Sequence, residues 1–280
     1  MQRALQQQYA ERFRQLHNHE QPLTLVNAWD AASARVIEAC GAPAIATTSA
    51  AMAWSLGYAD GEQMPVVDLV RSCERICRVV GVPVSVDIER GFGQTTAEVC
   101  TNVRALLGVG VVGINIEDGV DRQTGKLHAA RLLADRIEAI RALAWEIGVP
   151  LFINARTDAY VSSSVDPATR HDETVARARI YVEAGADGIF VPGLADIDLI
   201  ARLASTLPAP LNVYAGSDHT PAVATLAHAN VRRISLGCGP LQASLALTRR
   251  IASEALERGT YSSMTADMFP GDAANALFAA

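Results

Sequence analysis

The sequence is nearly devoid of lysine. Among its 280 residues Lys126 is the only one, so 23 of the 24 basic residues are arginine. An enzyme that works through a Schiff base needs a lysine amine at its reacting centre. The chain offers one candidate for that role, which tightly restricts imine chemistry.

Long apolar runs and clustered basic residues are also lacking. No stretch of 18 uncharged apolar residues occurs, and residues 1–20 hold no apolar segment of the kind found in signal peptides. The net charge is −6 and the arginines are scattered, whereas a nucleic-acid partner requires gathered positive charge. These absences predict a cytoplasmic enzyme with neither a nucleic-acid nor a membrane partner.

The cysteines are few, and their spacing matches no metal-binding motif. The five cysteines are an odd number and form no CxxC motif. Cys73 and Cys77 would share one helical face, but no histidine stands at matching spacing for a zinc site. We therefore expect free thiols, mostly buried, rather than a disulfide framework or a structural metal.

What the sequence does contain is an alternation of short apolar runs with longer helical patterns. The runs are almost continuously hydrophobic, as expected for parallel strands buried on both faces. They span residues 23–29, 44–49, 83–89, 113–118, 151–157, 188–193, 211–215 and 232–236. Helical patterns between and after them span residues 31–40, 66–80, 96–108, 129–147, 172–184, 196–207, 220–229 and 241–257.

Eight such units without a linker predict one closed (β/α)8 barrel of the TIM type, with residues 1–280 as a single domain. Residues 1–20 would form an extra N-terminal helix and residues 260–280 a C-terminal arm. The alternative is a doubly wound open sheet, but no GxGxxG follows the first strand.

Polar residues gather where the predicted strands end, which is where barrel enzymes place their active sites. Period-two alternation puts Asp87 with Glu89, and Asn115 with Glu117, on faces that point into the barrel mouth. Three buried carboxylates cannot all stay ionised there without a cation. Oxygen ligands favour Mg²⁺, with Mn²⁺ as the second choice. The alternative is an internal ion-pair network that only closes the barrel.

Further candidates lie on neighbouring strands and loops. Arg156 ends the fifth strand and could bind a carboxylate or a developing oxyanion. Asn212, at the end of the seventh strand, is assigned to substrate binding. The polar loop over residues 119–130 holds Lys126 and His128 and is long enough to be a lid, or it is simply a solvated loop. The Gly237-Cys-Gly239 turn could cradle a phosphate or a carboxylate.

Several of these motifs together resemble the isocitrate lyase/phosphoenolpyruvate mutase superfamily. The resemblance runs in order from about residue 25 to residue 245. Its motifs are Thr47-Thr-Ser49, Leu56-Gly-Tyr-Ala-Asp60, Asp87-Ile-Glu-Arg-Gly-Phe-Gly93, Ile116-Glu-Asp118, Asn154-Ala-Arg-Thr-Asp158 and Glu183-Ala-Gly-Ala-Asp187.

The resemblance implies a fold, an activity and residue roles. The fold would be a barrel whose eighth helix is swapped with a neighbour in a homodimer or homotetramer. The reaction would be Mg²⁺-dependent cleavage or formation of a C–C or P–C bond beside a 2-oxo acid, through a metal-stabilised enolate. Asp87 resembles the direct metal ligand, and Asp60, Glu89 and Glu117 the carboxylates around it. Arg156 resembles the substrate-contacting arginine, and Thr48, Ser49 and Ala50 the cradle for the substrate's charge.

One departure narrows the activity. Isocitrate and methylisocitrate lyases carry a cysteine acid/base in the loop after the fourth strand, and this sequence has no cysteine between Cys100 and Cys238. The sequence therefore predicts a branch without that thiol, acting on a small 2-oxo or 2-hydroxy diacid as a lyase or decarboxylase. The catalytic candidates are Arg156, Glu117, Lys126 and His128. Phosphonate chemistry is one alternative. A barrel that binds a 2-oxo acid with little turnover is the other.

Overall fold

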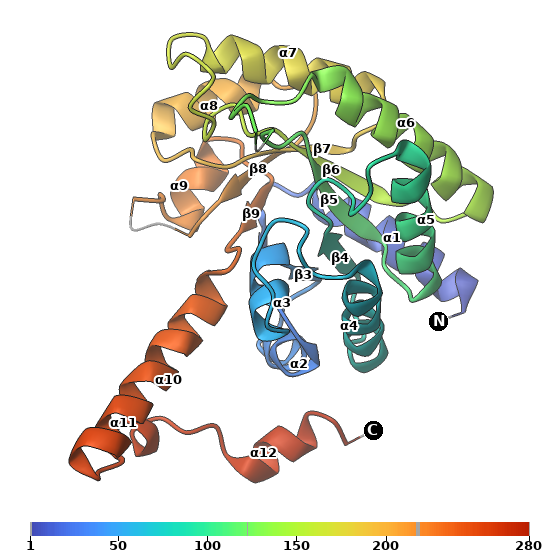
Figure 1. Ribbon diagram of the computed structural model, residues 1–280. Helices are drawn as coiled ribbons and strands as arrows, with labels where there is room; N and C mark the ends of the chain where they lie inside the picture. Colours follow the sequence, from blue (N-terminus) through green and yellow to red (C-terminus); the bar gives the residue numbers. More distant parts are fainter. Residues whose placement is uncertain (1, 122, 217–218, 280) are drawn as a thin grey trace.

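The structure is a computed structural model that describes residues 2–121, 123–216 and 219–279. Parallel strands stand in the order β1-β9-β8-β7-β6-β5-β4-β3-β2 and form a nearly closed barrel (Figure 1). The predicted barrel is thus confirmed. The strands are β1 (Leu23–Leu25), β2 (Asn27–Ala28), β3 (Ile45–Thr47), β4 (Val84–Asp87), β5 (Gly113–Glu117), β6 (Phe152–Arg156), β7 (Gly188–Val191), β8 (Leu211–Tyr214) and β9 (Arg233–Ser235).

The ring closes through the first strand, which the sequence predicts as one run over residues 23–29. It is instead divided at Val26, because its two halves pair with different neighbours. Leu25 of β1 stands opposite Ser235 of β9, whereas Ala28 of β2 stands opposite Thr47 of β3. The bend lets one short segment bridge both edges of the sheet.

Helices alternate with the strands and surround most of the barrel (Figure 1). They are α1 (Arg3–Leu16), α2 (Ala31–Ala39), α3 (Ser49–Ser55), α4 (Val66–Val79), α5 (Thr96–Gly108), α6 (Ala130–Ile147), α7 (Arg170–Glu183), α8 (Ile197–Thr206), α9 (Val223–His228), α10 (Gly239–Arg258), α11 (Ser262–Thr265) and α12 (Gly271–Ala276). The predicted helices are present, although α9 is shorter than the pattern over residues 220–229. The short helix α3 was not predicted.

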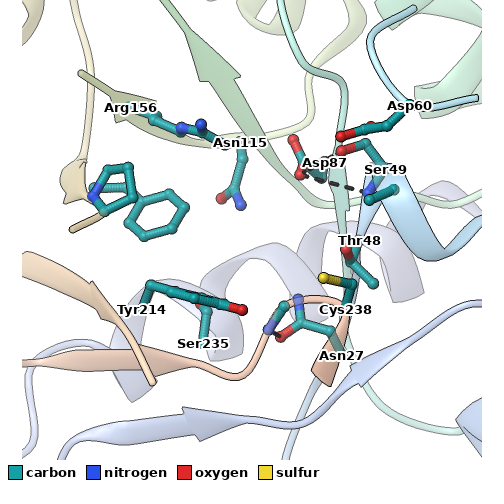
Figure 2. A pocket seen from close by; sticks show the side chains of 14 residues that line it. Asn27, Thr48, Ser49, Asp60, Asp87, Asn115, Arg156, Tyr214, Ser235 and Cys238 are labelled. Atoms are coloured by element: carbon teal, nitrogen blue, oxygen red, sulfur yellow. Dashed lines mark hydrogen bonds between the residues drawn. The ribbon is translucent and has the colours of Figure 1, made fainter. Parts of the chain in front are cut away.

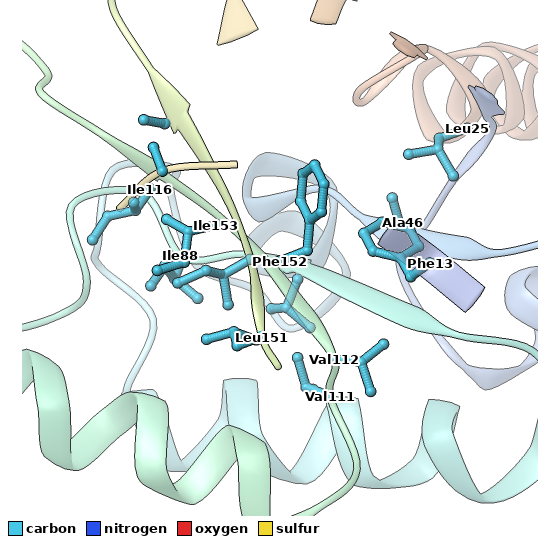
Figure 3. Close-up of a cluster of buried hydrophobic side chains, with 14 of the residues drawn as sticks. Phe13, Leu25, Ala46, Ile88, Val111, Val112, Ile116, Leu151, Phe152 and Ile153 are labelled. Carbon is cyan, nitrogen blue, oxygen red and sulfur yellow. The ribbon is translucent and has the colours of Figure 1, made fainter. Parts of the chain in front are cut away.

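The N-terminal helix α1 covers the lower end of the barrel, where the strands begin. Phe13 of α1 is fully buried and packs edge-on against Phe152, the first residue of β6 (Figure 3). A Cβ on Gly113, the first residue of β5, would come within 2.7 Å of the Phe13 ring, so only glycine fits there. The helix therefore plugs this end and leaves the opposite end to carry the site.

A histidine in this plug is held neutral. The His17 ring stacks on Phe152, and its Nδ1 lies 2.8 Å from the Phe13 carbonyl oxygen, to which it would donate in the tautomer that this contact favours. Burial lowers the pKa of His17 to about 3, helped by the positive charge of Arg233. Because the neutral ring is then the stable form, His17 acts as a packing residue.

No described helix is both long and apolar enough to cross a membrane. The core of the molecule lies inside the barrel and between the barrel and its helices.

Candidate active site

A cavity of about 230 Å³ opens at the carboxyl ends of the strands (Figure 2). Its size is below the roughly 300–1,000 Å³ typical of drug-sized ligands, so it suits a small molecule. The cavity brings together nine of the residues that the sequence singled out. These are Thr48, Ser49, Ala50, Asp60, Asp87, Asn115, Arg156, Gly237 and Cys238.

Asp87 is the last residue of β4, and its carboxylate is held from two sides. The Ser49 hydroxyl donates to Oδ2 at 3.1 Å, and the Glu89 backbone N–H donates to Oδ1 at 3.2 Å. The Ser49 N–H also points to Oδ2, at 3.5 Å. Because these donors hold the carboxylate from the end of β4 and from α3, the carboxylate of Asp87 has a fixed orientation in the cavity.

Arg156 ends β6 and lies between two carboxylates. Its Nε donates to Asp158 at 2.7 Å, and its Nη1 lies 3.0 Å from Glu117. Burial alone would lower the pKa of Arg156, but the charges of Glu117 and Asp158 outweigh burial and raise it. Phe190 packs beside the guanidinium, 5.7 Å from ring centre to Cζ. A guanidinium carries five N–H donors, so Arg156 keeps further N–H groups for a ligand after these two contacts.

Glu89 and Glu117 line a second cavity rather than the first. Regular alternation stops at Asp87, where β4 ends, and the backbone of Glu89 takes a left-handed φ of +49°. Glu89 therefore does not continue the alternation of the strand and lines the second cavity, but its carboxyl group stays close enough to Asp87 for that charge to raise its pKa. Glu117 reaches the first cavity only through its ion pair with Arg156.

The loop after β5 folds into a small hairpin, with Val120 paired to Leu127. His128, at its base, lines the second cavity with Glu89 and Glu117, while Lys126 is exposed on the hairpin. Burial lowers the pKa of His128, and nearby arginines add to the effect. Since neither residue lines the first cavity, the structure offers no lysine for a Schiff base there.

The cavity floor is a buried polar network. Asn115 lines the cavity, and its Oδ1 accepts from Asn154 at 2.9 Å and from Arg233 at 3.0 Å. Burial lowers the pKa of Arg233 to about 9, against the opposing influence of Asp87. Asn212 is also buried, and its Oδ1 accepts from the Ser235 hydroxyl at 3.2 Å, so it supports the wall instead of lining it.

The acidic side chains around the two cavities are the groups that could hold a metal ion. In the part of the chain that the structure describes, no three acidic, histidine or cysteine side chains are grouped as a complete metal site. Burial nevertheless raises the pKa of Glu89 to about 8, helped by the charges of Asp87 and Asp60. Burial also raises the pKa of Glu117, in spite of Arg156 beside it. Acidic side chains outnumber basic ones around the two cavities, and their oxygen ligands fit a hard divalent cation.

Sequence reasoning missed several residues of the cavity wall. Tyr214 ends β8, Ser235 ends β9, and Asn27 begins β2, near the end of the first predicted run. Their positions follow the strand-end rule that identified Asp87, but hydroxyl and amide groups carry a weaker chemical signal than clustered carboxylates. Cys238 belongs to the Gly237-Cys-Gly239 turn, which the sequence did single out.

Known proteins match the chain in sequence and in fold. It is 31% identical to the 2-methylisocitrate lyase of Halalkalibacterium halodurans over 74% of this chain and 67% of the relative. It is 30% identical to the oxaloacetate decarboxylase of a Bradyrhizobium strain over 77% of this chain and 74% of the relative. A crystal structure from Burkholderia cenocepacia, provisionally described as a lyase or mutase, matches with a TM-score of 0.90 and 34% identity, covering 99% of this chain and 98% of that one.

The family model for phosphoenolpyruvate phosphomutase matches residues 13–256, which includes every strand and all the predicted site residues. Relatives named as lyases and decarboxylases agree with that match. The chain therefore belongs to the phosphoenolpyruvate mutase family and so to the isocitrate lyase/phosphoenolpyruvate mutase superfamily of enzymes.

Proposed function

We propose that the protein is a Mg²⁺-dependent lyase or decarboxylase that acts on a small 2-oxo or 2-hydroxy dicarboxylic acid through an enolate. The observation that carries this proposal is the small cavity in which Arg156 faces Asp87 and Asp60. An arginine fork suits a substrate carboxylate, and an acidic group beside it suits a cation. The relatives named above support this class, because their names give as substrates a 2-hydroxy tricarboxylic acid and a 2-oxo dicarboxylic acid.

The chain's own groups would do three things. Asp87 would hold the cation, with Asp60, Glu89 and Glu117 around it, and the bound cation would polarise the 2-oxo group as a Lewis acid. Arg156 would bind and orient a substrate carboxylate with the N–H groups that Glu117 and Asp158 leave available. Thr48, Ser49 and Ala50 would border the substrate where charge develops.

A substrate panel tests the proposal. With Mg²⁺ present, we expect pyruvate or CO₂ release from at least one small 2-oxo or 2-hydroxy diacid, and loss of that release when EDTA removes the metal. We expect negligible cleavage of isocitrate and 2-methylisocitrate, because the hairpin over residues 120–127 holds no thiol. Coupled spectrophotometric and gas-release assays measure both products.

The outcomes of the panel separate the alternatives. Phosphate release from phosphonopyruvate would favour C–P bond chemistry. Binding of 2-oxo acids without turnover of any compound would favour a binding protein. Rapid glyoxylate release from isocitrate, or pyruvate release from 2-methylisocitrate, would contradict the predicted branch.

We also propose that α10 packs on a second copy of the chain. The helix extends away from its own barrel, and of its 20 residues only Leu241 is buried (Figure 1). Leu245 and Leu256 share a helical face with Leu241, yet they are 50% and 86% exposed. A barrel helix with an uncovered apolar face fits the swapped arrangement that the resemblance implies.

Sedimentation measures this arrangement. We expect the protein to be a dimer or tetramer at micromolar concentration and the double variant Leu245→Asp/Leu256→Asp to shift toward monomer, because two charges would be buried at the contact. Leu5→Asp on α1, where Leu5 is 40% exposed, is the matched control and should leave the assembly unchanged. A monomeric parent protein would contradict the proposal.

A further inference from the structure

The wall opposite the carboxylates holds a phenol and a thiol. Tyr214 and Cys238 both line the cavity, on the side away from Arg156, Asp87 and Asp60 (Figure 2). Tyr214 ends β8, and Cys238 directly precedes α10. The two come from neighbouring βα units, so the barrel itself brings them together.

The thiol is positioned by the backbone around it. The Gly237 N–H donates to Asn27 Oδ1 at 2.8 Å, and Asn27 Nδ2 in turn donates to the Thr47 carbonyl at 2.7 Å. Asn27 is almost fully buried. These hydrogen bonds connect the turn that carries Cys238, which follows β9, to β2 and β3.

The phenol occupies a space that two glycines leave open. A Cβ on Gly216 would lie 1.9 Å from the Tyr214 hydroxyl oxygen, and a Cβ on Gly237 would lie 2.5 Å from its Cε2. Any larger residue at either position would displace the ring. The phenol is thereby held next to the thiol, and burial together with Cys238 raises the pKa of Tyr214.

Proton donors are few in this cavity. Of the described residues that line it, Arg156 holds its proton too strongly to give it up, and Asp60 and Asp87 form the acidic face. Lys126 and His128 lie outside it. Serine and threonine hydroxyls are far weaker acids than a thiol, whose usual pKa is about 8.5. The Cys238 thiol, with Tyr214 beside it, is the best-placed group to give a proton to carbon.

We propose that Cys238 is the catalytic residue that protonates the enolate carbon, with Tyr214 as the neighbour that stabilises the resulting thiolate. The inference rests on the proposed function, which generates an enolate. In the step the S–H bond breaks and a C–H bond forms with the enolate's electron pair, while the enolate oxygen becomes the 2-oxo carbonyl. Sulfur is left as a thiolate, which accepts the Tyr214 hydrogen bond and is reprotonated by water.

Deuterium exchange into pyruvate isolates this step, because it needs no C–C cleavage. We expect the parent protein with Mg²⁺ to exchange the methyl hydrogens of pyruvate for deuterium in D₂O, as followed by proton NMR. General acid–base groups contribute about 10²–10⁴-fold. Cys238→Ala and Cys238→Ser should each lose at least about 100-fold of the exchange rate, and Tyr214→Phe should lose less. Cys40→Ala, at an exposed thiol outside the cavity, is the matched control and should exchange at the parent rate.

A second measurement separates proton transfer from the earlier chemistry. On the best decarboxylation substrate of the panel, Cys238→Ser should release CO₂ faster than it forms pyruvate, because C–C cleavage precedes protonation. Parent-like exchange by Cys238→Ser or Cys238→Ala would overturn the role of Cys238 and leave the proposed function standing. A parent protein that neither exchanges pyruvate nor turns over any panel compound would overturn the proposed function itself.

Discussion

Asp87→Asn is expected to abolish turnover while leaving the fold intact. The amide keeps an oxygen that can accept from Ser49, but the negative charge that a cation requires is gone. Charge stabilisation by a bound metal is worth several kcal/mol, and each 1.36 kcal/mol is tenfold in rate, so kcat/KM should fall by about three orders of magnitude. Titration calorimetry with Mg²⁺ should show weakened or lost binding.

The control for this variant is Asp135→Asn. Asp135 is a half-exposed carboxylate on α6 that pairs with Arg131, so its loss should change neither turnover nor metal binding. Circular dichroism and thermal unfolding should show a parent-like fold for both variants. An Asp87→Asn protein that binds Mg²⁺ and 2-oxo acids as well as the parent would refute the assignment of Asp87.

The barrel was predictable because its signal is local. Strands buried on both faces read as continuous apolar runs, and the runs over residues 83–89 and 151–157 contain β4 and β6, which are shorter by one or two residues at each end. The division at Val26 was not predictable, because it depends on which neighbours close the ring. The helix α3 was missed because its sequence, Ser-Ala-Ala-Met-Ala-Trp-Ser, is too short to show a period.

The sequence predicted where the candidate site lies, but not how its residues are divided between the two cavities. Strand ends pointed correctly to Asp87 and Arg156 as neighbours in one cavity. They could not show that Glu89 lines the second cavity instead of the first, because that follows from a left-handed backbone at a residue other than glycine. They also could not show the room made for Tyr214, which depends on glycines in two separate loops.

Substitution of Arg156 should also have a large effect on activity. Two different substitutions separate its role in binding the substrate from its role in neutralising nearby carboxylates. Arg156→Lys keeps the charge but loses the planar fork that binds Glu117 and Asp158 together. We expect kcat/KM to fall by about 10²–10³-fold, the cost seen when one preorganised donor is removed, with a small change in stability. Steady-state kinetics and urea unfolding measure the two effects.

Arg156→Met should lose activity and stability together. It leaves two carboxylates near each other with no guanidinium, and breaking a buried pair from one side costs about 3–5 kcal/mol. Adding Glu117→Gln removes one of the two carboxyl groups that lose their partner, so the double variant should recover part of the free energy of unfolding and none of the activity. A double variant no more stable than Arg156→Met would show that Glu117 without its partner does not destabilise the fold. Parent-like kinetics in Arg156→Lys would show that the planar guanidinium is not used on the substrate. Recovery of stability without activity is the result expected if the guanidinium both neutralises Glu117 and Asp158 and binds the substrate.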